Sequence, residues 1–97
     1  MVKVSEKRRT AMRRVGFVFH GAPGKTVYIA GSFNDWEPEK SPMLYDDAAG
    51  YYAIDIDLAP GYYEYKFVVD DLWVLDETNH NFAANDFGTL NSVIEIE

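Results

Sequence analysis

Apolar and polar residues alternate along most of this chain. From residue 15 to the end the dominant hydrophobic period is two, and turn-forming residues recur about every ten positions. No amphipathic segment of helix length follows residue 14. A period of two with regular turns is typical of an antiparallel sandwich or barrel. We therefore predict an all-β fold, an antiparallel β-sandwich of about seven strands.

The expected strands follow from the alternation and from the turn residues between them. They are residues 15–20, 25–30, 43–45, 51–58, 62–69, 72–75 and 92–97. In the fourth strand Tyr52 and Leu58 share one face, whereas Asp55 and Asp57 share the other, so only one face is buried. A polar loop, residues 31–41, and a polar stretch, residues 76–89, are expected to lack regular structure. The loop is long for a hairpin connection, which marks it for a functional role.

The charge of the chain divides it into two parts. Six of its nine basic residues precede residue 15, and residues 15–97 hold three basic and fifteen acidic residues, a net charge of −12. We expect a basic N-terminal extension, residues 1–14, and one folded domain, residues 15–97. The acidic body disfavours nucleic-acid binding. The extension is interpreted as a solvated or partner-docked segment in which residues 6–14 could form a short helix.

Composition and motif spacing argue against several functional classes. The chain has no cysteine, which excludes disulfides, cysteine-containing zinc sites and a thiol nucleophile. The longest apolar run after the basic terminus, residues 15–19, is too short for a membrane span or a signal peptide, so we interpret the protein as cytoplasmic. Its two histidines lack metal-ligand spacing, and no serine lies in a nucleophile motif, so no catalytic residue, metal or cofactor is expected. Asp55 and Asp57 are spaced like a glycosidase pair, but an open strand face favours a solvated role.

A hairpin places one tryptophan on a face that meets water. If Asp70 and Asp71 form a two-residue turn, Val69 pairs with Leu72, Val68 with Trp73, and Phe67 with Val74. Side chains alternate between the two faces of a strand. The apolar face is therefore expected to hold Tyr63, Tyr65, Phe67, Val69, Leu72 and Val74, and the solvated face Glu64, Lys66, Val68, Trp73 and Leu75. A large exposed ring of this kind suits the apolar C–H face of a sugar, although a covering loop would be an alternative explanation. Trp36 lies in the 31–41 loop, where it either joins such a site or packs into the end of the sandwich.

Three segments resemble a known family. They are the run from Val27 to Trp36 (VYIAGSFNDW), the segment from Tyr65 to Asp70 (YKFVVD) with Trp73, and the later FGTLNS from Phe87. Together they resemble the glycogen-binding domain of the AMP-activated kinase β subunit. That domain is an early-set carbohydrate-binding module, also found on isoamylases and glycogen-branching enzymes. The resemblance covers residues 15–97 in the right order. Asp71 and Glu77 stand where the family often has glycine and proline.

The resemblance implies a fold, a ligand and a set of site residues. The fold is an immunoglobulin-like (early-set) sandwich, and the ligand is an α-1,4-linked glucan such as glycogen, starch or a maltooligosaccharide. By position, Trp36 and Trp73 are the stacking platforms, and Lys66, Thr89 and Asn91 match hydroxyl-binding residues. Phe87 falls where the family has a leucine that reaches over the sugar, and we hypothesise that the aromatic ring keeps or strengthens that contact.

The alternative is an early-set module that docks a protein partner without binding sugar. The family supports this alternative because such domains accompany an enzyme or a kinase, and fold alone does not decide function. The presence of Trp36, Lys66, Trp73 and Asn91 together favours carbohydrate binding. We expect either a free-standing module or a subunit that sits beside a glycogen-metabolising enzyme or kinase. An open sheet edge also makes a homo-oligomer possible.

Overall fold

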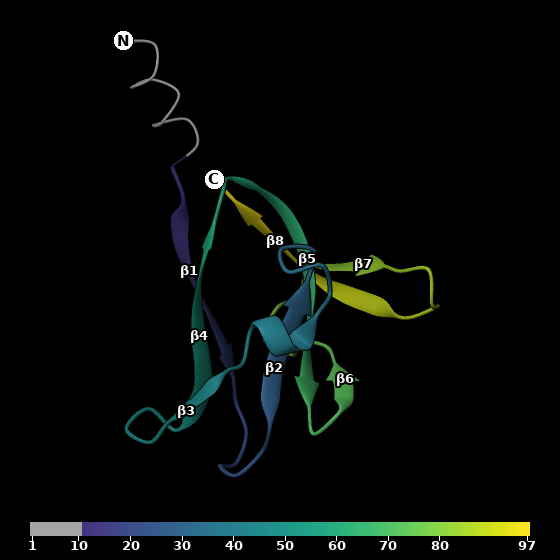
Figure 1. Cartoon of the computed structure of the whole chain (residues 1–97). Coiled ribbons are helices and arrows are strands. Elements are labelled where there is room, and N and C mark those ends of the chain that lie inside the picture. Colours follow the sequence, from purple (N-terminus) through teal and green to yellow (C-terminus); the bar gives the residue numbers. More distant parts are fainter. Residues whose placement is uncertain (1–10) are drawn as a thin grey trace.

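The computed structural model describes residues 11–97, which form two antiparallel sheets that pack against each other (Figure 1). The first sheet has the order β1 (Arg13–Phe19), β4 (Tyr51–Leu58), β3 (Leu44–Asp46). The second has the order β2 (Val27–Gly31), β5 (Gly61–Val69), β8 (Leu90–Ile96), β7 (Phe82–Ala84), with β6 (Leu72–Val74) also paired to β5. A single 3₁₀ turn, η1 (Pro38–Lys40), interrupts the strands of this described region. The predicted all-β antiparallel sandwich is confirmed.

The strand count and some strand limits differ from those expected. Residues 11–97 form eight strands, because Phe82–Ala84 pairs with β8 inside the stretch that is expected to be irregular. β7 holds one large apolar residue, Phe82, and is flanked by Asn81 and Asn85, so no alternation marks it in the sequence. β1 begins at Arg13, so Arg13 and Arg14 pair with β4 and are not helical. Residues 1–10 of the expected basic extension lie outside the described residues.

Aromatic and aliphatic side chains, with one methionine, fill the space between the two sheets. The buried core consists of Phe17, Val27, Ile29, Met43, Tyr52, Leu58, Tyr65, Phe67 and Val69. Phe17 and Tyr65, from opposite sheets, meet edge to face with ring centroids 5.1 Å apart. The alternation predicted for β4 is confirmed, since Tyr52 and Leu58 are buried whereas Asp55 and Asp57 are exposed. No helix among residues 11–97 is long and apolar enough to cross a membrane.

The β5–β6 hairpin has the predicted register. Val69 pairs with Leu72, Val68 with Trp73, and Phe67 with Val74. Asp70 and Asp71 have φ values of 49° and 70°, the left-handed conformation that a two-residue type I′ turn requires. Aspartate tolerates this conformation better than most residues, so the turn forms without glycine. The hairpin therefore fixes which face of the second sheet carries Trp73.

Two residues of this hairpin do not have the burial that parity predicted. Leu72, expected on the buried face, is 68% exposed. The inner side of β6 borders a hollow and is not covered by a strand of the opposite sheet. Val68, expected on the solvated face, is 5% exposed. It pairs with Tyr28 on one side and Trp73 on the other, and two large flanking rings cover a small side chain. Parity gives the direction of a side chain but not what lies over it.

Candidate functional site

An open hollow lies over the outer face of the second sheet. Its volume is about 990 Å³, and the six side chains expected to bind sugar all line it: Trp36, Lys66, Trp73, Phe87, Thr89 and Asn91. Trp73 is 48% exposed, as the hairpin register predicted. The structure thus brings together residues from β5, β6 and β8 and from two separate loops.

Trp36 reaches the hollow because a buried asparagine organises its loop. The Asn34 side chain accepts a hydrogen bond from the Gly31 amide (2.9 Å) and donates to the Ile29 carbonyl and to Ser41 Oγ (both 3.0 Å). The Trp36 amide in turn donates to the Gly31 carbonyl at 3.0 Å. Trp36 is half-buried and has a φ of 58°. A β-carbon at Gly31 would lie 2.5 Å from the Glu64 carbonyl oxygen, so only glycine fits there.

The opposite rim of the hollow is the loop between β7 and β8. Phe87 stands at its tip and is 90% exposed, with nothing in the described chain covering its ring. Gly88 has a φ of 81°, which allows the chain to turn back toward Thr89. An aromatic side chain presented in this way is available for a ligand that enters the hollow.

The polar side chains between the two aromatic rims form hydrogen bonds with one another. Lys66 Nζ donates to Thr89 Oγ1 at 3.1 Å, and Asn91 Nδ2 donates to Glu64 Oε1 at 3.0 Å. Asn91 is buried, whereas Lys66 is half-buried. Tyr62 lies at one end, where partial burial and the neighbouring Glu64 carboxylate raise the pKa of its hydroxyl.

Sequence reasoning missed several residues of this hollow. Ser32, Tyr62, Glu64, Ala84, Asn85 and Asp86 also line it. Tyr62 and Glu64 share strand parity with Lys66, so the alternation of β5 could have placed them in the site. Asn85 could have been found as the first residue of a turn, since asparagine often bonds the backbone two residues on.

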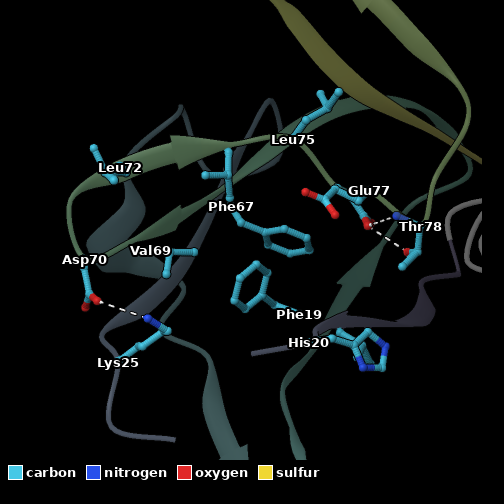
Figure 2. A pocket seen from close by; sticks show the side chains of 13 residues that line it. Phe19, His20, Lys25, Phe67, Val69, Asp70, Leu72, Leu75, Glu77 and Thr78 are labelled. Carbon is cyan, nitrogen blue, oxygen red and sulfur yellow. Dashed lines mark hydrogen bonds and ion pairs between the residues drawn. The ribbon is translucent and has the colours of Figure 1, made fainter. Parts of the chain in front are cut away.

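A second, smaller hollow opens at the edge of the sandwich between β1 and β6 (Figure 2). Its volume is about 370 Å³. Phe19 and Phe67 meet edge to face in it, with ring centroids 5.3 Å apart, and Lys25 and Asp70 form an ion pair of 3.8 Å at its rim. None of the six predicted site residues lines it. Residues 11–97 hold no cluster of three or more side chains suited to a metal ion.

A sandwich that presents two tryptophans and a polar lysine-threonine-asparagine rim in one open hollow defines a carbohydrate-recognition domain. A scan of protein families matches residues 14–97 to the model described as the glycogen recognition site of AMP-activated protein kinase. The chain belongs to this family.

Curated relatives agree with the family. The chain is 34% identical over 96 residues to 5'-AMP-activated protein kinase subunit beta-1 of Rattus norvegicus, covering 99% of this chain and 33% of that protein. It is 33% identical to the Sus scrofa beta-1 sequence, covering 99% of this chain and 74% of that sequence. The Mus musculus beta-2 subunit is 35% identical over 74 residues, covering 76% of this chain and 26% of that protein. The chain thus spans about a third of the length of the rat relative.

Proposed function

We propose that this chain binds α-1,4-linked glucan without catalysing any reaction on it. Trp36 and Trp73 act as stacking platforms for the apolar faces of glucose units. Lys66, Thr89 and Asn91 bind hydroxyl groups, and Phe87 closes over the sugar from the loop tip. The observation that carries the proposal is that these side chains, which come from five places in the sequence, line one hollow.

The chemistry of the hollow sets the expected affinity. Each stack that covers roughly 60 Å² of apolar surface contributes about 1.5 kcal/mol at 25 cal/mol per Å². Two stacks and a few hydrogen bonds, less the cost of association, correspond to a dissociation constant of roughly micromolar to millimolar. A site of this strength suits a polymer with many repeated units, such as glycogen, because several domains or several contacts then act together.

Affinity electrophoresis tests the proposal. The purified chain is run in native gels that contain glycogen, amylose, cellulose-type β-1,4-glucan or no polymer. We expect retardation by the two α-glucans only, because the curvature of an α-1,4 chain is what lets neighbouring units reach both tryptophans. Equal migration in all gels would contradict the proposal.

The names of the relatives suggest a partner. They are subunits of a protein kinase, and we propose that this chain also serves as, or within, a regulatory subunit that brings a cytoplasmic kinase or glycogen-metabolising enzyme to glucan. Co-purification of the full protein with a kinase, eluted from a glycogen resin by maltoheptaose, tests this. A kinase that elutes together with the chain supports the assignment, and a chain that elutes alone opposes it.

A further inference from the structure

One residue of the hollow uses its whole hydrogen-bonding capacity inside the protein. Asn85, at the start of the β7–β8 loop, accepts from the backbone amides of Phe87 (3.0 Å) and Thr89 (3.1 Å) through its side-chain oxygen. Its side-chain nitrogen donates to Thr89 Oγ1 (2.8 Å) and to Asn91 Oδ1 (2.9 Å). An asparagine side chain has two donor hydrogens and two acceptor lone pairs. Asn85 therefore has no hydrogen bond left to offer a sugar.

These bonds decide which hydrogen bond Thr89 can make. Its hydroxyl oxygen accepts from Asn85 Nδ2 at 2.8 Å and from Lys66 Nζ at 3.1 Å. A hydroxyl has two acceptor lone pairs and one hydrogen, so only the hydrogen is left. Because the side chain is exposed at the hollow, the Thr89 hydroxyl faces a ligand as a donor.

The orientation of the Asn91 amide is fixed from both sides. Its oxygen accepts from Asn85 Nδ2 at 2.9 Å, and its nitrogen donates to Glu64 Oε1 at 3.0 Å. A reversed amide would bring two donors together at Asn85 and two acceptors together at Glu64. Asn91 is therefore held with one hydrogen and one lone pair free, a pair that matches two adjacent hydroxyls of a sugar.

We propose that Asn85 is the positioning residue of the glucan site. It does not touch the sugar. It fixes the donor direction of Thr89 and the amide orientation of Asn91 before the ligand arrives, so binding does not have to order them. The inference deepens the proposed function and rests on it.

The substitution Asn85→Asp separates this role from that of holding the loop. A carboxylate keeps both acceptors for the amides of Phe87 and Thr89, so the loop turn persists. It replaces the donor nitrogen by an acceptor that faces the oxygens of Thr89 and Asn91. We expect affinity for β-cyclodextrin, measured by calorimetry, to fall about tenfold or more, with the urea unfolding midpoint close to that of the parent. Asn81→Asp makes the same change of charge outside the hollow, and its affinity is expected to equal that of the parent.

A double-mutant cycle gives a readout that loop stability alone does not move. Thr89→Val removes the hydroxyl and keeps the side-chain shape. If Asn85 acts partly through that hydroxyl, the loss in the double variant is smaller than the product of the two single losses. Strict multiplication of the losses, or parent affinity in Asn85→Asp, overturns the inference while the parent still binds. Failure of the parent protein itself to bind β-cyclodextrin contradicts the proposed function instead.

Discussion

The Tyr65 hydroxyl donates a hydrogen bond of 2.7 Å to Asp76 Oδ2, and both residues are buried. The bond joins β5 to the segment that leads from β6 to β7. The Asp76 amide donates to Ser92 Oγ at 3.1 Å, and Asn79 Nδ2 donates to the Tyr65 oxygen at 3.1 Å. A small polar cluster therefore fastens the 76–81 segment to the core beneath β8.

Asp76→Ala is expected to destabilise the domain. The change leaves the buried Tyr65 hydroxyl without its acceptor and removes the bonds that Asp76 accepts from Thr78. A buried donor that loses its partner costs about 1 to 3 kcal/mol. Urea unfolding followed by circular dichroism measures the loss. The adjacent exposed residue provides the control, since Glu77→Ala is expected to change stability by less than about 0.5 kcal/mol.

Stability is expected to fall in alkaline solution. Burial, assisted by the hydrogen bond to Asp76, raises the pKa of the Tyr65 hydroxyl well above its ordinary value of 10.0. At a pH above the ordinary value of 10.0, the unfolded chain loses this proton whereas the folded chain keeps it. Unfolding then releases a proton and becomes more favourable as pH rises. At a pH well below 10.0, Tyr65 is protonated in both states and contributes no pH dependence to the free energy of unfolding. Unfolding free energies measured from pH 8 to 11 should decline less steeply in Tyr65→Phe than in the parent, and equal slopes would contradict the assignment.

Asn34→Ala is expected to affect both stability and the position of Trp36. Asn34 is 8% exposed, and its side chain makes three hydrogen bonds, to Gly31, Ile29 and Ser41. Its loss leaves the Gly31 amide and the Ile29 carbonyl without these partners, at a cost of about 2 kcal/mol. Since the loop holds Trp36, glucan affinity should fall as well, even where circular dichroism shows a folded protein. Glu39→Ala, on the exposed side of η1, should change neither property.

Glucan binding is expected to be insensitive to salt. A neutral sugar that stacks on rings and bonds to polar groups gains nothing from long-range charge, so no counterions are displaced. Calorimetric affinities for maltoheptaose in low and high sodium chloride should differ by less than about twofold, in contrast to the steep decline seen for anionic polymers. A steep fall with salt would indicate that Lys66 binds an anion.

The fold follows from local rules where a turn fixes the strand register. The Asp70-Asp71 turn is two residues long, and that length alone determines which residues of β5 and β6 face each other. Burial depends on the other sheet, which the pattern of one hairpin does not contain. Leu72 is exposed because the inner side of β6 borders the hollow beside Phe19. Val68 is covered by its neighbours from two other strands.

The predicted site residues were those with a recognisable side chain or a family match. The hairpin register singles out Trp73, whereas Trp36 and Phe87 are assigned by the family resemblance, and the structure places all three around one hollow. Asn85 did not stand out, because its role consists of bonds to Phe87, Thr89 and Asn91 that exist only once the loop has closed. Residues that position others are therefore the part of a binding site that sequence patterns show least.

The most direct measurement is a titration of tryptophan fluorescence with β-cyclodextrin in the parent and in Trp36→Ala and Trp73→Ala. The parent retains both platforms, and each variant retains one tryptophan as a reporter. The account predicts a saturable change in the parent at micromolar to millimolar ligand, and a loss of affinity of about tenfold or more in each folded variant. No change in the folded parent at millimolar ligand, or parent affinity in both variants, would contradict glucan binding at this site.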